Sequence, residues 1–396
     1  MIPRKVIFSK LWKTVLFSCI LLFFSVNAGV TSRSRGSIDL VFCIDLSAST
    51  NGLIDDVREK IWDIVNQVGA YRPSPSFRIG VIGFARPSFG EENAYVKILF
   101  PLSDDYDALE NELYKLKPMV EKGDQYVGEA LKVAVKKMDW VTDPDAMRVI
   151  CIAGNGLVTT GNSESFRNAC DEAVKRDIVI NTMYCRTRNN AERDLPGWME
   201  IARITGGQQF DIKIHKRTPL VLTSPDPARL KVLASNLNNT YIFYGKNGAF
   251  RYRMMVANDK RAYDASMMSF ESRLYHKISD RFQFHQQGWD VIDYIKISNS
   301  DLEENFSMEE MNDSLKFKTP AYVRELAVRL KQDRNRIISE LRKHLPYDRL
   351  NTINKKLEDS DLDKSDAFER TTMQALNKTA IAKGFVPASA GQDNLY

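Results

Sequence analysis

The sequence of 396 residues has few of the side chains on which common enzyme sites depend. It contains only four histidines, His215, His276, His285 and His344. None of them belongs to an H-E-x-x-H motif or lies near a pair of cysteines, which argues against a zinc hydrolase and a zinc finger. The sequence also has no G-x-S-x-G turn and no G-x-x-x-x-G-K-[ST] loop. Catalysis is therefore the minor hypothesis, and we do not predict an enzyme.

Long apolar runs are also scarce, and the one that stands out lies at the start of the chain. Basic residues precede the apolar stretch 15–26, and Val26-Asn27-Ala28 resembles a cleavage site. The run is short and lacks a flank on its far side, so we expect residues 1–28 to be a secretory signal peptide. An uncleaved N-terminal anchor is the alternative. The mature chain should then be secreted, periplasmic or part of the cell envelope, without a membrane span.

A strong excess of charge of one sign is missing as well. The formal net charge is +5, and residues 1–28 contribute four basic residues and no acidic one. Removal of the signal peptide would leave a chain that is close to neutral. The sequence therefore gives no reason to expect a nucleic-acid partner.

Cysteines are few, and four remain after the expected signal peptide: Cys43, Cys151, Cys170 and Cys185. An even number of cysteines in an exported protein permits disulfides. Three of the four lie inside apolar runs, however, and small free thiols pack well in a core. Buried free thiols are the favoured interpretation, and a disulfide between Cys170 and Cys185 is the alternative.

Oxygen-bearing side chains do gather at one point of the chain. The apolar run 40–44 has the length and composition of a buried parallel strand, and it is followed by Asp45, Ser47 and Ser49 in a D-x-S-x-S pattern. A carboxylate and two alternate hydroxyls put three hard oxygens on one loop, which suits Mg²⁺ or Mn²⁺. The alternative is that Ser49 or Asn51 caps the helix that starts near Leu53.

The following segments alternate between apolar strands and amphipathic helices. Strands are predicted over residues 77–84, 97–102, 148–153, 178–184 and 208–212, and helices over 53–69, 107–116, 129–138, 165–176 and 196–205. Pro101 favours an edge position for the strand that contains it. The alternation predicts an α/β fold, a doubly wound and mostly parallel sheet with helices on both faces. Ligands of such sheets bind at the carboxyl ends of the strands, where Asp45 is expected to lie.

These landmarks resemble the von Willebrand factor type A (vWA) domain over residues 37–214. The resemblance is carried by the D-x-S-x-S motif, the strand 77–84, the glycine loop before Glu129, the strand beginning at Arg148 and the segment 201–207. It implies a Rossmann-like sheet and a module that mediates protein binding or adhesion. It also implies a metal-ion-dependent adhesion site that begins at Asp45.

The resemblance extends to the metal ligands, with two departures. In the family's usual site, a threonine of a second loop ligates the metal and an aspartate of a third loop holds it through water. Here Gln125 aligns with the threonine, Asn155 aligns with the aspartate, and Asp124 is near enough to compensate. The implied metal site is Asp45, Ser47, Ser49, Gln125 and Asn155, with Asp124 as a further candidate and Mg²⁺ or Mn²⁺ as the cation. A single remaining carboxylate predicts weak affinity.

Beyond residue 214 the pattern changes to helices with polar breaks. Residues 215–250 should be a linker with a short helix over 230–237 and an aromatic segment, 240–244, that docks on the first domain. Residues 251–396 should be mainly α-helical, with helices over 257–284, from Pro320 onward and over 367–383. The basic helix after Pro320 has the composition of a membrane-surface element, but a solvated helix is the favoured interpretation because acidic residues interrupt its charge.

The sequence thus predicts an exported binding module whose strand-end loops engage a protein ligand. An acidic residue of that ligand would complete the coordination of the cation. The alternative is a structural or assembly protein that acts through its helical tail and whose metal site is inert. An unrecognised hydrolase is a third hypothesis, but no histidine near Ser47 is available to activate it.

Overall fold

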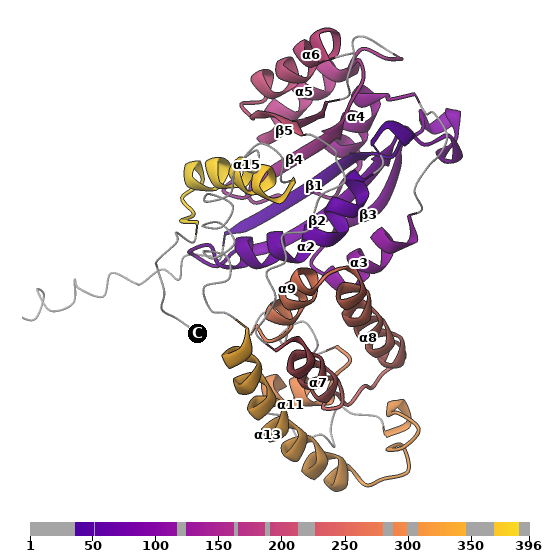
Figure 1. The fold of residues 1–396 in the computed structure, drawn as a ribbon, viewed down its shortest axis with the longest axis vertical. Coiled ribbons are helices and arrows are strands. Elements are labelled where there is room, and N and C mark those ends of the chain that lie inside the picture. The colour runs from indigo at the N-terminus through magenta and orange to yellow at the C-terminus, as the bar shows by residue number, and fades with distance from the viewer. Residues whose placement is uncertain are drawn as a thin grey trace, which may run out of the picture.

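The computed structural model describes residues 36–50, 52–116, 124–161, 165–186, 191–212, 226–279, 288–298, 308–345 and 368–387. The expected signal peptide lies outside the described residues. Within them, a sheet with helices on both faces adjoins a lobe of helices (Figure 1). No described helix is long and apolar enough to cross a membrane.

The sheet has six strands in the order β3-β2-β1-β4-β5-β6. They are β1 (Ser37–Asp45), β2 (Ser76–Phe84), β3 (Lys97–Ser103), β4 (Met147–Gly154), β5 (Ile178–Cys185) and β6 (Gln209–Ile212). Only β3 pairs antiparallel with its neighbour, and it forms one edge of the sheet, as Pro101 predicted. The predicted fold class, α/β with a mostly parallel sheet, is confirmed.

One face of the sheet is covered by helices that follow each other along the chain. They are α4 (Val127–Lys137), α5 (Ser165–Lys175) and α6 (Ala191–Ile204). Phe166 and Trp198 are fully buried in the core on this face. Helix α6 begins at Ala191 rather than at Pro196, because Glu192 and Asp194 give it an acidic first turn and Pro196 is accommodated inside it.

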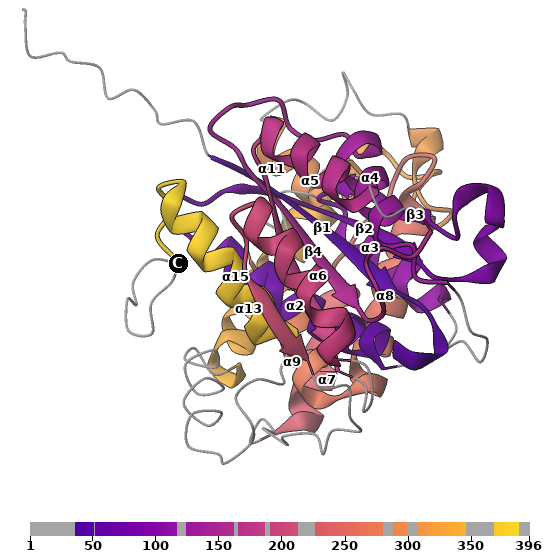
Figure 2. The ribbon, with the colours of Figure 1, turned by 90° about the horizontal axis from the view of Figure 1, so that it is seen from above.

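The other face is covered by segments that are far apart in the sequence. They are α2 (Leu53–Gly69), α3 (Tyr106–Lys115) and α15 (Phe368–Ala382), and Figures 1 and 2 show α15 beside α2. The ring of Phe368 lies 5.5 Å from that of Phe42 on β1. Leu376 belongs to the same buried cluster as Met183 of β5, and Val386 pairs with Arg72 after the helix ends. The helix predicted over 367–383 is confirmed, but it completes the cover of the sheet instead of extending a tail.

The helical lobe contains the remaining helices. They are α7 (Pro227–Asn238), α8 (Gly248–Ala265), α9 (Met267–Lys277), α11 (Val291–Ser298), the short η4 (Met308–Glu310) and α13 (Pro320–His344). The helical character of this region is confirmed. A single helix was expected over 257–284, of which 280–284 lie outside the described residues. In the described part this is wrong, because Ser266 ends α8 and its side chain accepts a hydrogen bond from the Ser269 N–H at the start of α9.

The expected docking of the aromatic segment 240–244 on the first domain is also wrong. Tyr241 stacks on Trp289, with 5.6 Å between ring centroids, inside the lobe. The guanidinium of Arg334 on α13 lies 4.1 Å from the Tyr241 ring and donates to the Thr240 carbonyl oxygen at 3.0 Å. The segment is thus held by a buried arginine of its own lobe, which the sequence pattern placed among solvated charges.

The lobe joins the sheet domain through buried charges, which we call the junction: Asp107, Glu110, Asp259, Arg273 and Lys277. Arg273 of α9 pairs with Asp107 of α3 at 2.6 Å and with Asp259 of α8 at 3.1 Å. Its guanidinium also lies 4.4 Å from the Trp62 ring on α2. Lys277 is ion-paired with Asp259. The lobe is therefore tied to the α2 and α3 side of the sheet domain.

All four cysteines of the described chain, Cys43, Cys151, Cys170 and Cys185, are free and buried. Burial raises the pKa of the Cys151 thiol to about 12. The interpretation as buried thiols is confirmed, and the Cys170–Cys185 disulfide is not formed.

Candidate functional site

The carboxyl ends of β1 and β4 lie side by side, because these strands pair in parallel with Ile44 opposite Ala153. Asp45 ends β1, and Asn155 follows the end of β4. Gln125 reaches the same place from the turn before α4. We call the group the strand-end site: Asp45, Ser47, Ser49, Gln125 and Asn155. The structure brings all five predicted residues together.

The loop after β1 is wrapped around Asp45. The Ser47 N–H donates to Asp45 Oδ1 at 2.8 Å, which folds the loop back on the carboxylate. Thr50 donates from its hydroxyl to the Asp45 carbonyl oxygen at 2.9 Å. Thr50 was not predicted as part of the site, although a hydroxyl that follows D-x-S-x-S directly could have signalled it. Helix α2 has Gly52 at its N-cap position and no side-chain cap, so Ser49 does not serve as its cap. Asn51, the other candidate for this cap, lies outside the described residues.

The hydroxyls and amides of the site form one hydrogen-bonded set. Ser47 Oγ and Ser49 Oγ are 2.9 Å apart. Ser49 Oγ lies 3.3 Å from Asn155 Oδ1 and 3.2 Å from Asn155 Nδ2. Gln125 Nε2 donates to Asn155 Oδ1 at 3.0 Å and, more weakly, to Ser47 Oγ at 3.4 Å. In the described structure, oxygens of the loops after β1 and β4 and the amide nitrogen of Gln125 therefore converge on each other.

Asp124 does not join this set. Its side chain is exposed, and no hydrogen bond or ion pair among the described residues links its carboxylate to the other five. Its compensating role therefore stays a prediction. Within the described residues, no group of three or more His, Cys, Asp or Glu could hold a metal, so a cation here would depend on neutral oxygens and one carboxylate.

Asp45 is electrostatically unusual among the buried aspartates. Its side chain is only 1% exposed. Burial raises its pKa to about 6, although hydrogen bonds from Ser47, Asn155 and Thr50 act in the opposite direction. No lysine or arginine of the described chain pairs with it. Each other buried aspartate has such a partner within 4.0 Å: Asp39, Asp63, Asp107, Asp194, Asp259, Asp290 and Asp293.

The donors of the site fit a weakly held hard cation. Mg²⁺ takes oxygen ligands in an octahedron at roughly 2.1 Å, which puts neighbouring ligand oxygens about 3 Å apart. The two serine hydroxyls already have this spacing. A cation would also supply the positive charge that no lysine or arginine of the described residues provides beside Asp45. The amide nitrogen of Gln125, which faces the same oxygens, is the feature that opposes a cation.

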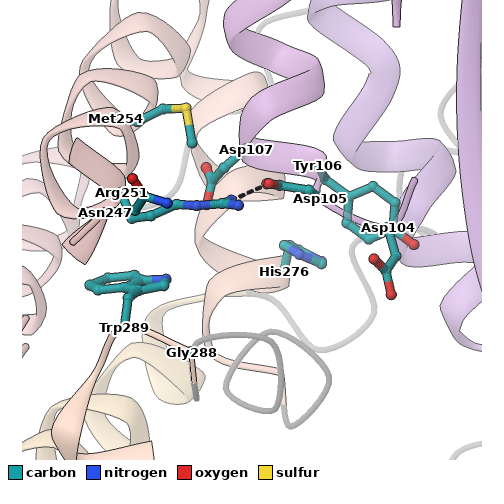
Figure 3. A pocket seen from close by; sticks show the side chains of 10 residues that line it. All are labelled: Asp104, Asp105, Tyr106, Asp107, Asn247, Arg251, Met254, His276, Gly288 and Trp289. Carbon is teal, nitrogen blue, oxygen red and sulfur yellow. Dashed lines mark hydrogen bonds and ion pairs between the residues drawn. The ribbon is translucent and has the colours of Figure 1, made fainter. Parts of the chain in front are cut away.

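A separate pocket of about 290 Å³ lies between α3 and the helical lobe (Figure 3). Asp104, Asp105 and Asp107 line one wall, and Trp289 lies on the lobe side. Arg251 reaches across from α8 and is ion-paired with Asp105. None of the predicted site residues lines this pocket, and its acidic wall is partly neutralised by the chain's own arginine.

Comparison with known families finds a match within the sheet domain. The sequence model of the family described as von Willebrand factor type A domain matches residues 39–196. No curated protein matches the chain.

Solved structures are similar at low identity. An aerotolerance-related membrane protein from Bacteroides fragilis NCTC 9343, with multiple mutations to serines, is 16% identical over 45% of this chain and 92% of that chain, with a TM-score of 0.33. Proximal thread matrix protein 1 from the mussel byssus, with a zinc-occupied MIDAS motif, is 17% identical over 45% of this chain and 41% of that chain, with a TM-score of 0.35. The von Willebrand factor type A protein from Catenulispora acidiphila is 14% identical over 45% of this chain and 39% of that chain, with a TM-score of 0.34. The chain thus spans about two fifths of the latter two proteins. Residues 39–196 thus match the von Willebrand factor type A domain family, the observed six-stranded sheet agrees with this match, and a helical region follows.

Proposed function

We propose that the protein is a non-enzymatic binding module whose strand-end site engages a protein ligand. The observation that carries the proposal is Asp45, the one buried aspartate of the described chain without a lysine or arginine beside it. A buried carboxylate that lacks a cationic partner is costly in a low-dielectric environment. It lies at the edge of the sheet where ligands of such folds bind. We therefore assign the missing positive charge to a bound cation, since no lysine or arginine of the described residues supplies it.

The proposed source of this charge is a divalent cation, Mg²⁺ or Mn²⁺. Asp45, Ser47, Ser49 and Asn155 would hold it through their oxygens. When bound, the ion would act as an electrostatic bridge between the site and an oxygen ligand. Because the site offers one carboxylate, its dissociation constant for the cation should be on the order of 10⁻³ M, at the weak end of oxygen-liganded sites.

The proposed partner is a protein that presents an acidic side chain. Asp45, Ser47 and Asn155 are buried, whereas Ser49 is exposed and Gln125 is partly exposed, so a partner would meet the site through its outer groups. A carboxylate of the partner would complete the coordination of the cation from the open side. We further propose that the chain is exported, on the basis of the signal-like residues 1–28.

A second candidate is an assembly role of the helical lobe. Phe317, just before α13, is 86% exposed, and Tyr322 in the first turn of α13 is 45% exposed. The Nζ of Lys316 and of Lys318 lie 5.2 and 5.4 Å from the centroids of these two rings, respectively. Exposed aromatic residues of this size are typical of contact surfaces. In this alternative the strand-end site would be inert.

Variants of the full chain can separate the two candidates. Partners are captured from a native extract with the wild type, with Asp45→Ala and with the double variant Phe317→Ser, Tyr322→Ser, each in Mg²⁺ and in chelator. The proposal expects a partner that is lost with Asp45→Ala and in chelator and retained by the double variant. The reverse pattern would instead support assembly through the lobe.

A further inference from the structure

Gln125 has a distinct place in the strand-end site, and the role inferred for it rests on the proposed function. Gln125 lies in the turn directly before α4, where its backbone carbonyl oxygen accepts a hydrogen bond from the Val127 N–H at 2.9 Å. Its side chain points toward the loops after β1 and β4. The amide nitrogen Nε2 lies 3.0 Å from Asn155 Oδ1 and 3.4 Å from Ser47 Oγ.

A glycine makes room for this arrangement. A side-chain carbon at Gly156 would lie only 2.6 Å from Gln125 Oε1. Gly156 also has a φ of +83°, a backbone conformation that other residues rarely adopt. The carbonyl end of the Gln125 amide therefore rests against Gly156, and the NH₂ end turns toward the oxygens of the site.

The chemistry of an amide NH₂ decides what this position does. It donates two hydrogen bonds and accepts none, so it uses the lone pairs of the oxygens that it faces. A divalent cation needs the same lone pairs of Ser47 and Asn155. Asn155 Oδ1 has two lone pairs and already faces both Ser49 Oγ and Gln125 Nε2, so a cation that binds this oxygen must displace one of these two groups. Ser49 can itself offer an oxygen to the cation, so the Gln125 amide is the group that is displaced. In addition, the partial positive charge of the NH₂ group lies close to a site that has one carboxylate and, among the residues that the structure describes, no basic side chain.

We infer that Gln125 is an internal competitor of the cation: its amide NH₂ takes the cation's place between the loops when no cation is bound. The strand-end site therefore keeps its shape without metal, and a cation binds only by displacing the Gln125 side chain. Gln125 is thus a positioning residue that sets the affinity of the site. In this role it opposes the cation, and it is not one of its ligands.

Two variants of the full chain test this role. Gln125→Ala removes the amide and adds no ligand, and Gln125→Thr replaces the amide with a hydroxyl. Gln209→Ala is the matched control, because Gln209 on β6 makes a similar side-chain hydrogen bond, to Asp211 Oδ1 at 3.0 Å, away from the site. Two quantities are measured for each protein: the Kd for Mn²⁺ by calorimetry and the urea midpoint of unfolding in chelator.

We expect Gln125→Ala to lower the Kd for Mn²⁺, and Gln125→Thr to lower it by about tenfold relative to the wild type. In chelator, Gln125→Ala should unfold at a lower urea midpoint, because two hydrogen bonds between the loops are lost. Saturating Mn²⁺ should abolish this difference. The Gln209→Ala control should keep the wild-type Kd.

The outcomes distinguish this inference from the proposed function. If the wild type binds Mn²⁺ and Gln125→Ala binds it more weakly, Gln125 is a ligand, and the inference is wrong while the proposed function stands. If the metal-free midpoint of Gln125→Ala equals that of the wild type, the amide does not hold the loops, and the inference fails as well. If none of these proteins binds Mn²⁺, including Gln125→Thr, the cation role falls, and the competition falls with it.

Discussion

At the junction, the buried aspartates face basic side chains of the same chain, whereas at the strand-end site Asp45 faces only hydrogen-bond donors among the described residues. Asp259 illustrates the first case: burial alone would raise its pKa, but Lys277 and Arg273 hold the pKa below its ordinary value. Asp45 illustrates the second, because its hydrogen bonds do not offset burial and its pKa is raised to about 6. The aspartates of the junction are therefore paired with basic side chains of the chain itself, whereas Asp45 has no such partner among the described residues.

The largest expected effect comes from removing α15. Deletion of residues 368–396 strips the sheet of Phe368, Leu376 and Phe385, which are buried against it. Full burial of one such side chain is worth about 2 kcal/mol, so the losses together approach the roughly 5–15 kcal/mol by which a domain is stable. We expect no cooperative unfolding transition in urea. Deletion of residues 388–396 alone is the control, and a wild-type midpoint for the longer deletion would contradict the described cover of the sheet.

The next largest effect is expected at the junction. Arg273→Met keeps much of the side-chain volume and leaves Asp107 and Asp259 with less positive charge. Breaking a buried ion pair from one side typically destabilises a protein by about 3–5 kcal/mol. Urea unfolding measures the loss. Lys260→Met on the exposed side of α8 is the matched control, since its side chain is 75% exposed and its ion pair with Asp264 should contribute little.

A smaller effect should depend on pH. Burial raises the pKa of Glu110 to about 8, against the opposing effect of Arg273 and with Asp107 and Asp259 adding to the rise. Because the folded-state value is above the unfolded one, the contribution of Glu110 is fully present at low pH and is lost as the pH rises through about 8. Between pH 5 and pH 7 the free energy of unfolding should therefore fall by about 2 kcal/mol. Glu110→Gln should remove this part of the pH dependence, as measured by urea unfolding at several pH values. An unchanged slope would exclude the assignment.

The smallest effect is predicted for Asp45→Asn in the absence of divalent cations. The substitution removes a buried charge that no basic side chain of the described part of the chain pairs with, so the free energy of unfolding should change by only about 1 kcal/mol or less. Asp259→Asn, which takes the charge from a paired carboxylate, should be clearly more destabilising. Equal losses for the two variants would remove the contrast between the junction and the site.

The sheet and one of its faces could be predicted because both depend on local patterns. Apolar runs define the strands, and α4, α5 and α6 follow each other in the order in which they cover the sheet. Helix α15 was predicted as a helix, but its amphipathic pattern does not say which surface it packs against. Arg334 was expected on a solvated helix, since a sequence does not show which basic residues find buried carboxylates.

The residues of the strand-end site could also be predicted, because the resemblance places them at strand ends that parallel pairing brings together. What the pattern could not give is the direction of a side chain. Gln125 aligns with a metal ligand, yet its amide nitrogen faces the oxygens of Asn155 and Ser47. The direction depends on Gly156, whose lack of a side chain leaves room for the amide.

The decisive experiment for the strand-end site is a calorimetric titration of Mg²⁺ and Mn²⁺ into the full chain, with Asp45→Ala as the control. We predict saturable binding of both ions with a Kd on the order of 10⁻³ M, and its complete loss in the variant. Asp39→Ala is a second control, because Asp39 lies on the same strand and is paired with Arg78. The absence of binding at concentrations well above this Kd, or equal binding by the wild type and Asp45→Ala, would contradict the proposal that the strand-end site is completed by a cation.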